Sequence, residues 1–432
     1  MGLKVNFKNS QLLWPFHYRD FNLLLTGECF YRSAIWMTSL VFGILATRIK
    51  GDSTFYVGLI GFGFNIPMLF LMPVTGVLAD RIVRLKILKW VQVIFMVPAL
   101  VMALVLLEGL PNYWLMLAMV LLFGVGFAVG NPALLSIVHD IVLEPKVLGG
   151  ALSIFISSSR IFQFVGYGLG GILFAVFGAG FCFWLSIGTY LITLFILFFV
   201  RTRVKIEHPD KPNFLQDVKE GFLFVKSFFP VWVVIALVIL NGFIVWPYIF
   251  QMPIVNKYYL GGTPATLGLL LALGGAGGAI GGLIVAFRKN TRHLTHLIII
   301  SSGVISVSLL LLTFCRQVSV AAPLMFTLDF GLSMLMIVSN VFVQHLTPNE
   351  KRGRVMSIFA MGNIGMIPLG SLVFYGGLGE WLGPMWMFFI GGVIFLVAIA
   401  LFIVVLPQIR QEAMPIFVQK GLIEADASPT QI

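Results

Sequence analysis

Four ionisable residues lie inside long apolar stretches of the chain, namely Glu28, Arg32, Arg160 and Asp329. A charged side chain at the centre of a membrane helix costs about 2.5–3.5 kcal/mol, so such residues usually serve a function. Glu28 and Arg32 are four positions apart, which places them on one face of a helix. A carboxylate that gains or loses a cationic neighbour can bind and release a proton. These residues, with Asp329 as a second candidate for protonation, therefore predict a proton-coupling or charge network.

The same residues allow other interpretations. Glu28 and Arg32 could form a permanent pair that stabilises helix packing and never titrates. Arg160 could pair with Glu28 or meet an anionic solute. Beside it, Ser157 to Ser159 and Gln163 make a polar face, although serines also mediate close packing between helices.

The elements that position these residues must be membrane helices. Of 432 residues, 59% are hydrophobic and 10% are charged, which excludes a water-soluble fold. A crossing needs roughly 20 apolar residues. We place twelve such runs at residues 21–47, 54–79, 85–107, 112–139, 148–175, 178–200, 229–256, 263–287, 294–314, 318–346, 352–378 and 382–406.

The basic residues predict the orientation. The formal net charge is +11, but the 28 Lys and Arg residues separate the apolar runs and form no patch, so we expect no nucleic-acid partner. With the N-terminus in the cytoplasm, 22 of the 28 lie on the cytoplasmic side, 4 lie outside and 2 lie within spans. Because basic loops resist translocation, both termini are predicted to be cytoplasmic.

Metal and cofactor sites are not expected. The three cysteines, Cys29, Cys182 and Cys315, show neither CxxC nor Cys/His spacing. His139, Asp140 and His345 lack ligand spacing, and hydrogen bonding at the membrane interface explains them better than a metal does.

The chain contains an internal repeat. Residues 149–155 (GGALSIF) resemble residues 353–359 (GRVMSIF) at an offset of 204, and Gly166 then aligns with Gly370. Both copies lead into the fifth span of their half, which indicates two parallel repeats. We divide the chain into a cytoplasmic N-terminus (1–20), a first six-helix half (21–200), a cytoplasmic linker with an amphipathic helix (201–228), a second six-helix half (229–406) and a cytoplasmic tail (407–432).

Two motifs carry a family resemblance. Residues 76–86 (GVLADRIVRLK) resemble the major facilitator superfamily loop G-x-L-A-D-R-x-G-R followed by a basic residue. Residues 348–357 (PNEKRGRVMS) resemble the run P-x-E-x-R-G-R-V-M-S of the branch that contains enterobactin-type siderophore exporters and macrolide efflux proteins. The resemblance implies an all-α integral membrane fold, with twelve transmembrane helices in two halves that alternate access to a central site.

The resemblance also assigns candidate residues. Asp80 is expected to lie against the start of span eleven as a cytoplasmic latch, although the basic residues near it could simply fix the topology. The predicted cytoplasmic gate comprises Gly76, Asp80, Arg81, Arg84, Arg352 and Arg354. The predicted substrate-binding residues are Tyr31, Trp36, Gln163, Asn241, Trp246 and Asn340. We expect Asn131-Pro132 and Trp246-Pro247 to interrupt or kink their helices.

Together these features predict a secondary transporter and not an enzyme. Its substrate would be a small amphipathic molecule, siderophore-like or drug-like, exported in exchange for protons. Val83 replaces the usual motif glycine, span four lacks an arginine, and span five reads GYGLGG where antiporters carry Gly-Pro, so import by the same fold is the alternative. We expect a monomer in the lipid bilayer of a bacterial inner membrane, with no metal and no cofactor.

Overall fold

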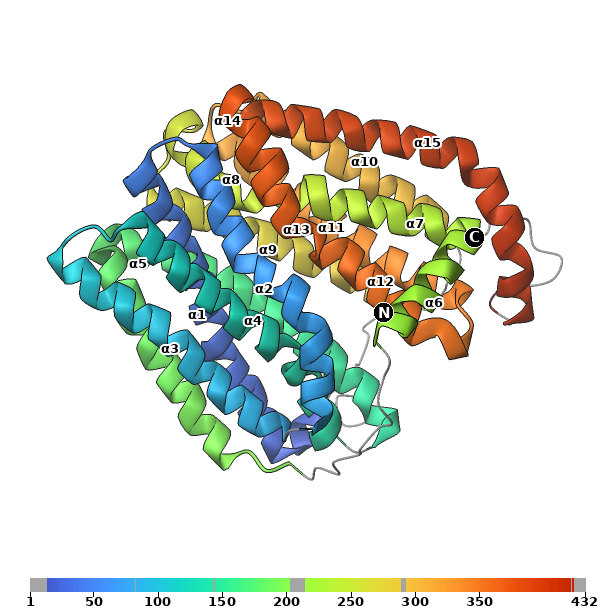
Figure 1. The fold of residues 1–432 in the computed structure, drawn as a ribbon, viewed down its shortest axis with the longest axis horizontal. Coiled ribbons are helices and arrows are strands. Elements are labelled where there is room, and N and C mark those ends of the chain that lie inside the picture. The colour runs from blue at the N-terminus through green and yellow to red at the C-terminus, as the bar shows by residue number, and fades with distance from the viewer. Residues whose placement is uncertain are drawn as a thin grey trace, which may run out of the picture.

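All regular structure in the described part of the chain is helical. The computed structural model describes residues 14–81, 83–142, 144–202, 214–288, 293–420 and 422, excepting the side chains of residues 14, 72–81, 145–146, 214–218 and 286. The first half contains α1 (Arg19–Lys50), α2 (Thr54–Arg81), α3 (Arg84–Glu108), α4 (Tyr113–Ile141) and α5 (Pro145–Phe199), after a 3-10 turn (Trp14–His17). This half occupies the lower left of Figure 1.

The second half is more fragmented. Its α-helices are α7 (Phe229–Leu240), α8 (Tyr248–Ile254), α9 (Pro264–Ala286), α10 (Leu294–Thr313), α11 (Val318–Leu346), α12 (Arg352–Ile364), α13 (Met366–Leu369), α14 (Gly379–Leu382) and α15 (Pro384–Gln419). Three π-helical segments join or extend them: η3 (Asn241–Val245), η4 (Val255–Tyr259) and η6 (Gly370–Leu378). A 3-10 turn, η5 (Asn349–Lys351), precedes α12.

Eleven helices in the described residues are long and apolar enough to cross a membrane. This confirms the predicted all-helical membrane fold. One of the eleven is α5, whose 55 residues would extend about 80 Å, far more than the roughly 30 Å of the hydrocarbon core. At Gly178 its backbone leaves the helical region, with φ 82° and ψ 179°, and the chain turns back on itself (Figure 1).

Two of the predicted helix interruptions have different outcomes. The α-helix is interrupted at Trp246 and Pro247, between η3 and α8, where the proline supplies no N–H to the helical ladder. Pro132, by contrast, lies inside α4, which continues past it to Ile141.

The last helix is longer than expected. The sequence places the end of the final span near residue 406, whereas α15 continues to Gln419. Two contacts explain the extension: the buried ring of Phe417 lies 6.2 Å from that of Phe342, and Arg410 bonds to α10. Part of the predicted tail is therefore packed helix.

The predicted amphipathic linker helix is present as α6 (Phe214–Ser227). It lies against α12, where Glu220 forms an ion pair with Arg354. Gly221 permits this approach, because a Cβ there would lie only 3.0 Å from the carbonyl oxygen of Arg354.

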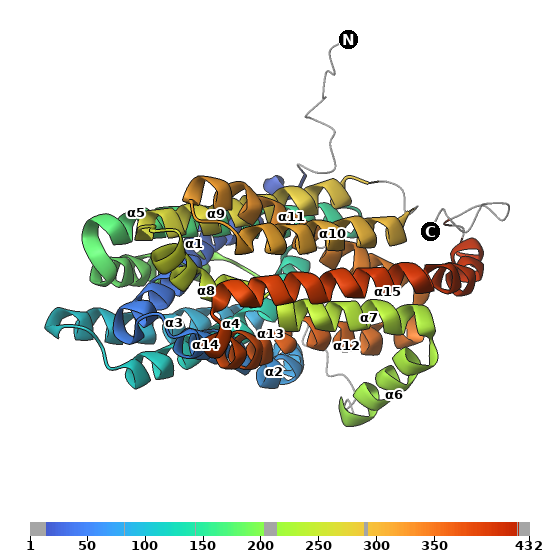
Figure 2. The same cartoon turned by 90° about the horizontal axis from the view of Figure 1, so that it is seen from above.

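The halves meet along two glycine-rich helix crossings. In one, α2 crosses η6, and a Cβ on Gly58 would lie 2.4 Å from the Ser371 carbonyl oxygen and 2.8 Å from Gly376 Cα. In the other, α5 crosses α9, and a Cβ on Gly268 would lie 2.7 Å from Gly171 Cα. Figure 2 shows α5 beside α9 on one side of the molecule and α2 with α13 and α14 on the other. Small residues permit such close backbone approach in membrane proteins.

Candidate functional site

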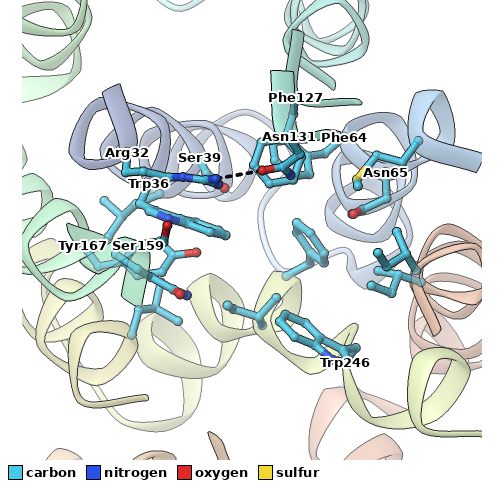
Figure 3. Close-up of a pocket in the computed structure, with 18 of the residues that line it drawn as sticks. Arg32, Trp36, Ser39, Phe64, Asn65, Phe127, Asn131, Ser159, Tyr167 and Trp246 are labelled. Atoms are coloured by element: carbon cyan, nitrogen blue, oxygen red, sulfur yellow. Dashed lines mark hydrogen bonds between the residues drawn. The ribbon is translucent and has the colours of Figure 1, made fainter. Parts of the chain in front are cut away.

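A central cavity of about 380 Å³ lies between the two halves (Figure 3). Its wall is mainly aromatic and aliphatic, with a few polar groups. The aromatic residues are Trp36, Phe64, Phe127, Phe155, Tyr167, Trp246 and Phe250, and the polar residues are Arg32, Ser39, Asn65, Asn131, Ser159, Arg160, Gln163 and Asn363. Such a wall suits an organic molecule, because the rings supply contact area and the polar groups fix orientation.

Two helices of the first half supply most of the polar wall. On α1 the lining positions are 32, 36, 39, 40 and 43, and on α5 they are 155, 156, 159, 160, 163 and 167. Both sets repeat every three or four residues, so each is a single stripe on one side of its helix. Helical periodicity alone therefore places Arg32 on the same face of α1 as Trp36, and Arg160 on the same face of α5 as Gln163.

Glu28 and Arg32 form the predicted ion pair, with both side chains buried. Arg32 also donates to Asn131 Oδ1 at 2.8 Å, which is the dashed contact in Figure 3. The hydroxyl of Ser159 donates to Glu28 Oε1 at 3.2 Å. The pair thus connects α1 to α4 and α5 at the cavity wall.

Arg160 lies in a second charge cluster, which spans both halves. Its Nη1 donates to Gln163 Oε1 at 3.2 Å, and its charge interacts with Asp329 of α11. Asp329 accepts a 2.8 Å hydrogen bond from the hydroxyl of Tyr248, and Gly274 leaves room for the carboxylate. The pairing of Arg160 with Glu28 that the sequence left open is not seen among the described contacts, because Glu28 is held by Arg32 and Ser159, and the charge of Arg160 interacts with Asp329.

Three of the six predicted substrate-binding residues line the cavity: Trp36, Gln163 and Trp246. Trp36 packs against the rings of Phe127 and Tyr167, at centroid distances of 6.2 and 5.3 Å.

The other three predicted substrate-binding residues are not among the residues that line this cavity. Tyr31 is 2% exposed and shares a small separate cavity with Glu28 and Gln92. Asn241 is fully buried and bonds to Met336, and Asn340 accepts from Gln344. Tyr31 is on a lining helix, α1, but on the face turned toward α3, whereas η3 and α11, which carry Asn241 and Asn340, supply none of the lining residues.

The cavity is accessible from one end of the bundle. At the end that carries the α4–α5 connection, the lining residues Leu135 and Ile156 are 43% and 54% exposed. A second cavity of about 340 Å³ lies there and shares Met68 with the first. At the opposite end, Leu40 and Val57 are only 2% and 1% exposed. We call the end with the α1–α2 connection (residues 51–53) the closed end and the other the open end.

The predicted gate residues are at the open end, and three of them, Arg84, Arg352 and Arg354, have described side-chain partners. Arg84 pairs with Asp140 of α4, and Arg352 donates to Asn349 at 2.6 Å. Arg354 pairs with α6, as described above. The side chains of Gly76, Asp80 and Arg81 lie outside the described residues.

His139 and His345, considered above for a metal site, are not brought together with other ligands. No group of three His, Cys, Asp or Glu side chains in the described part of the chain is arranged to hold a metal ion.

Residues 10–424 match the model of a family described as transmembrane secretion effector. The chain belongs to this family of the major facilitator superfamily. The match covers both halves, the linker helix and the cavity, so the predicted superfamily is confirmed. Membership identifies the protein as a multi-pass membrane transporter.

Individual relatives of this transporter agree with the family. It is 28% identical to the putative bacilysin exporter BacE of Bacillus subtilis (strain 168), over 71% of this chain and 76% of that protein. It is 24% identical to the uncharacterized MFS-type transporter YfiS of the same organism, over 85% and 89%.

Solved structures share the fold of this transporter. The nucleoside transporter NupG superimposes with a TM-score of 0.70 at 12% identity, over 89% of this chain and 98% of NupG. A D-xylose-proton symporter superimposes with a TM-score of 0.63 at 14% identity, over 88% and 97%.

The transporter's cavity includes residues that the sequence did not single out. Asn65, Phe64 and Met68 come from α2, which carries none of the predicted substrate-binding residues. A signal was available for one of them, because Asn65 is an amide in an otherwise apolar span. Tyr167 carried no comparable signal, since an aromatic residue in a membrane helix more often faces lipid.

Proposed function

We propose that this transporter exports a small amphipathic organic solute from the cytoplasm by alternating access, driven by protons. The observation that carries the proposal is the central cavity between the halves, which is accessible from one end and closed at the other. Export is supported by the relative named as a putative bacilysin exporter. The siderophore-like or drug-like character of the solute rests on the motif before α12 and on the aromatic wall.

The direction depends on the topology that we propose. The turn at Gly178 gives α5 two limbs, which supports twelve crossings and puts both termini on one side. The chain then divides into halves at residues 21–200 and 229–406. Because the predicted cytoplasmic basic residues are at the open end, the cavity in this conformation faces the cytoplasm. We place the protein as a monomer in the bacterial cytoplasmic membrane.

We propose that Arg160 binds an anionic group of the solute. Arg160 lines the cavity and donates a hydrogen bond to a neutral amide, that of Gln163. The charge of Asp329 reaches it from the other half. A solute carboxylate or phenolate could replace that interaction, while Trp36 and Trp246 contact the apolar part.

Proton coupling is assigned to two acids, the buried Glu28 and the half-buried Asp329. Glu28 is held by Arg32 and Ser159, and Asp329 is held by Tyr248 and the charge of Arg160. Because both acids depend on cations at the cavity wall, binding of an anionic solute would change their electrostatic surroundings. Solute binding is thereby linked to proton binding through the contacts that hold Glu28 and Asp329.

The test is flux in inside-out vesicles with an imposed pH gradient, using a labelled catecholate siderophore and a panel of anionic and cationic dyes. We expect gradient-driven accumulation of anionic compounds. Arg160→Ala removes a charge-assisted bond that contributes about 1.5–3 kcal/mol, so it should weaken their apparent affinity by roughly 10- to 150-fold. Arg160→Lys, which keeps the charge, should weaken it less.

Two outcomes would overturn parts of the proposal. Uptake in right-side-out vesicles with none in inside-out vesicles would make the protein an importer. Equal loss of anionic and cationic transport in Arg160→Ala, with normal protein yield, would remove the anion-binding role of Arg160.

A further inference from the structure

The closed end is held by a carboxylate that crosses from one half to the other. Glu380 is the second residue of α14 in the second half. Its Oε2 accepts a 2.9 Å hydrogen bond from the backbone N–H of Phe55, a 2.9 Å bond from Ser53 Oγ and a 3.2 Å bond from Thr54 Oγ1. All three donors are at the beginning of α2, in the first half.

These contacts satisfy a specific need of α2. The first N–H groups of a helix have no partner within it, and the helix dipole favours an anion at that position. Ser53 precedes the helix, and its hydroxyl accepts from the N–H of Tyr56 at 3.5 Å. Glu380 accepts a hydrogen bond from the preceding N–H, that of Phe55, and another from the Ser53 hydroxyl. The cap of α2 is thus completed by the other half of the protein.

We propose that Glu380 is a latch that stabilises the closed end by capping α2, an inference that rests on the alternating-access function proposed above. The latch lies next to the crossing of α2 and η6, where Gly58 meets Gly376. Opening this end requires α2 to move away from η6 and α14. Glu380 must then release all three donors, so its contacts exist only while this end is closed.

The position of Glu380 has a counterpart at the opposite end of α2. There Asp80 lies in the last turn of the same helix, and the sequence predicts that it lies against the start of α12. The run from α12 to α14 is antiparallel to α2, so each would carry an acid near its C-terminal end that caps the N-terminus of the other. Glu380 thus caps α2 at the closed end in this conformation and releases it when the halves rock.

A labelling experiment tests the latch without a substrate. The reporter is Ser39→Cys, on the cavity wall, in a background of Cys29→Ser, Cys182→Ala and Cys315→Ala. Right-side-out vesicles are treated with a membrane-impermeant maleimide. Loss of a charge at a helix N-terminus corresponds to about a two- to fivefold change in equilibrium, so Glu380→Gln should raise the labelling rate by that factor.

Two controls separate a latch from general loosening. Glu108→Gln changes an exposed acid at the same end and should leave the rate unchanged. A second reporter, Ser357→Cys, lines the cavity at the open end. In inside-out vesicles, its labelling should fall in Glu380→Gln, because opening one end closes the other.

The latch is refuted if neither Glu380→Gln nor Glu380→Ala changes the Ser39→Cys rate, or if both reporters label faster together. Since no solute or gradient is used, a failure of the solute panel leaves this result intact. Conversely, a failed latch with successful flux would show that the closed end is held by the glycine crossings alone.

Discussion

Replacing Gly58 by alanine should open the closed end. A Cβ at this position would lie 2.4 Å from the carbonyl oxygen of Ser371 and 2.8 Å from Gly376 Cα. Ordinary contact begins near 3.4 Å, so α2 and η6 would have to separate by about 1 Å. Both obstructing atoms belong to the backbone, so no change of rotamer can make room.

The size of the expected shift in the conformational equilibrium depends on which conformation carries the strain. Overpacking a closely packed site costs typically about 1–3 kcal/mol. This cost applies only while α2 crosses η6, whereas the higher helix propensity of alanine, about 1 kcal/mol, stabilises both conformations alike. The balance should therefore shift toward the conformation with this end open by roughly 5- to 150-fold.

The assay is maleimide labelling of the Ser39→Cys reporter from the outside, in parallel with thermal unfolding. The matched control is Gly303→Ala on α10, where a Cβ would meet no atom within 4 Å. It should leave labelling unchanged. If Gly58→Ala labels no faster than its parent, the two helices do not make this contact in the membrane, and the reasoning from close approach fails.

Two further predictions concern ion pairs that differ in burial. Glu28→Gln leaves Arg32 buried without a partner carboxylate. We therefore expect loss of proton-driven flux and a destabilisation of about 3–5 kcal/mol, measured by thermal unfolding in detergent. An unchanged melting temperature would contradict the importance of this pair. Glu220→Gln breaks a pair with Arg354 whose side chains are 39% and 36% exposed, so it should cost under about 1 kcal/mol and shift the melting temperature little. A large shift would mean that α6 depends on this pair for its attachment.

Much of the architecture was predictable because it depends on local chemistry. Membrane-length helices follow from runs of apolar residues, and the interruption at Trp246 and Pro247 follows from a missing N–H. The pairing of Glu28 with Arg32 follows from a spacing of four. Each of these inferences needs only the periodicity of a single helix.

Other features depend on which helices meet, and sequence patterns do not contain that information. Tyr31 and Arg32 are adjacent on α1, yet only Arg32 lines the cavity, because α3 covers the side that carries Tyr31. Asp329 lies near Arg160 across 169 positions of chain. Glu380 lies in the short connection that the sequence predicts between the last two spans. There it resembles any solvated acid until α2 is placed beside it. The prediction was limited by which helices pack against each other, and not by which segments form helices.

The π-helical segment η6 explains a small irregularity in the internal duplication of the chain. In the first half, Gly171 meets Gly268 of α9, which also faces the carbonyl of Tyr167, four residues before Gly171. In the second half, Gly376 meets Gly58 of α2, which also faces the carbonyl of Ser371, five residues before Gly376.

A π-helix is closed by i→i+5 hydrogen bonds, so each hydrogen-bonded loop contains one residue more than in an α-helix. Gly166 and Gly370 are 204 positions apart, whereas Gly171 and Gly376 are 205 apart. The two copies have thus diverged by a one-residue insertion that η6 absorbs as a wider turn, which keeps the contacting glycine in phase. Residues after this point should be compared between the copies at an offset of 205.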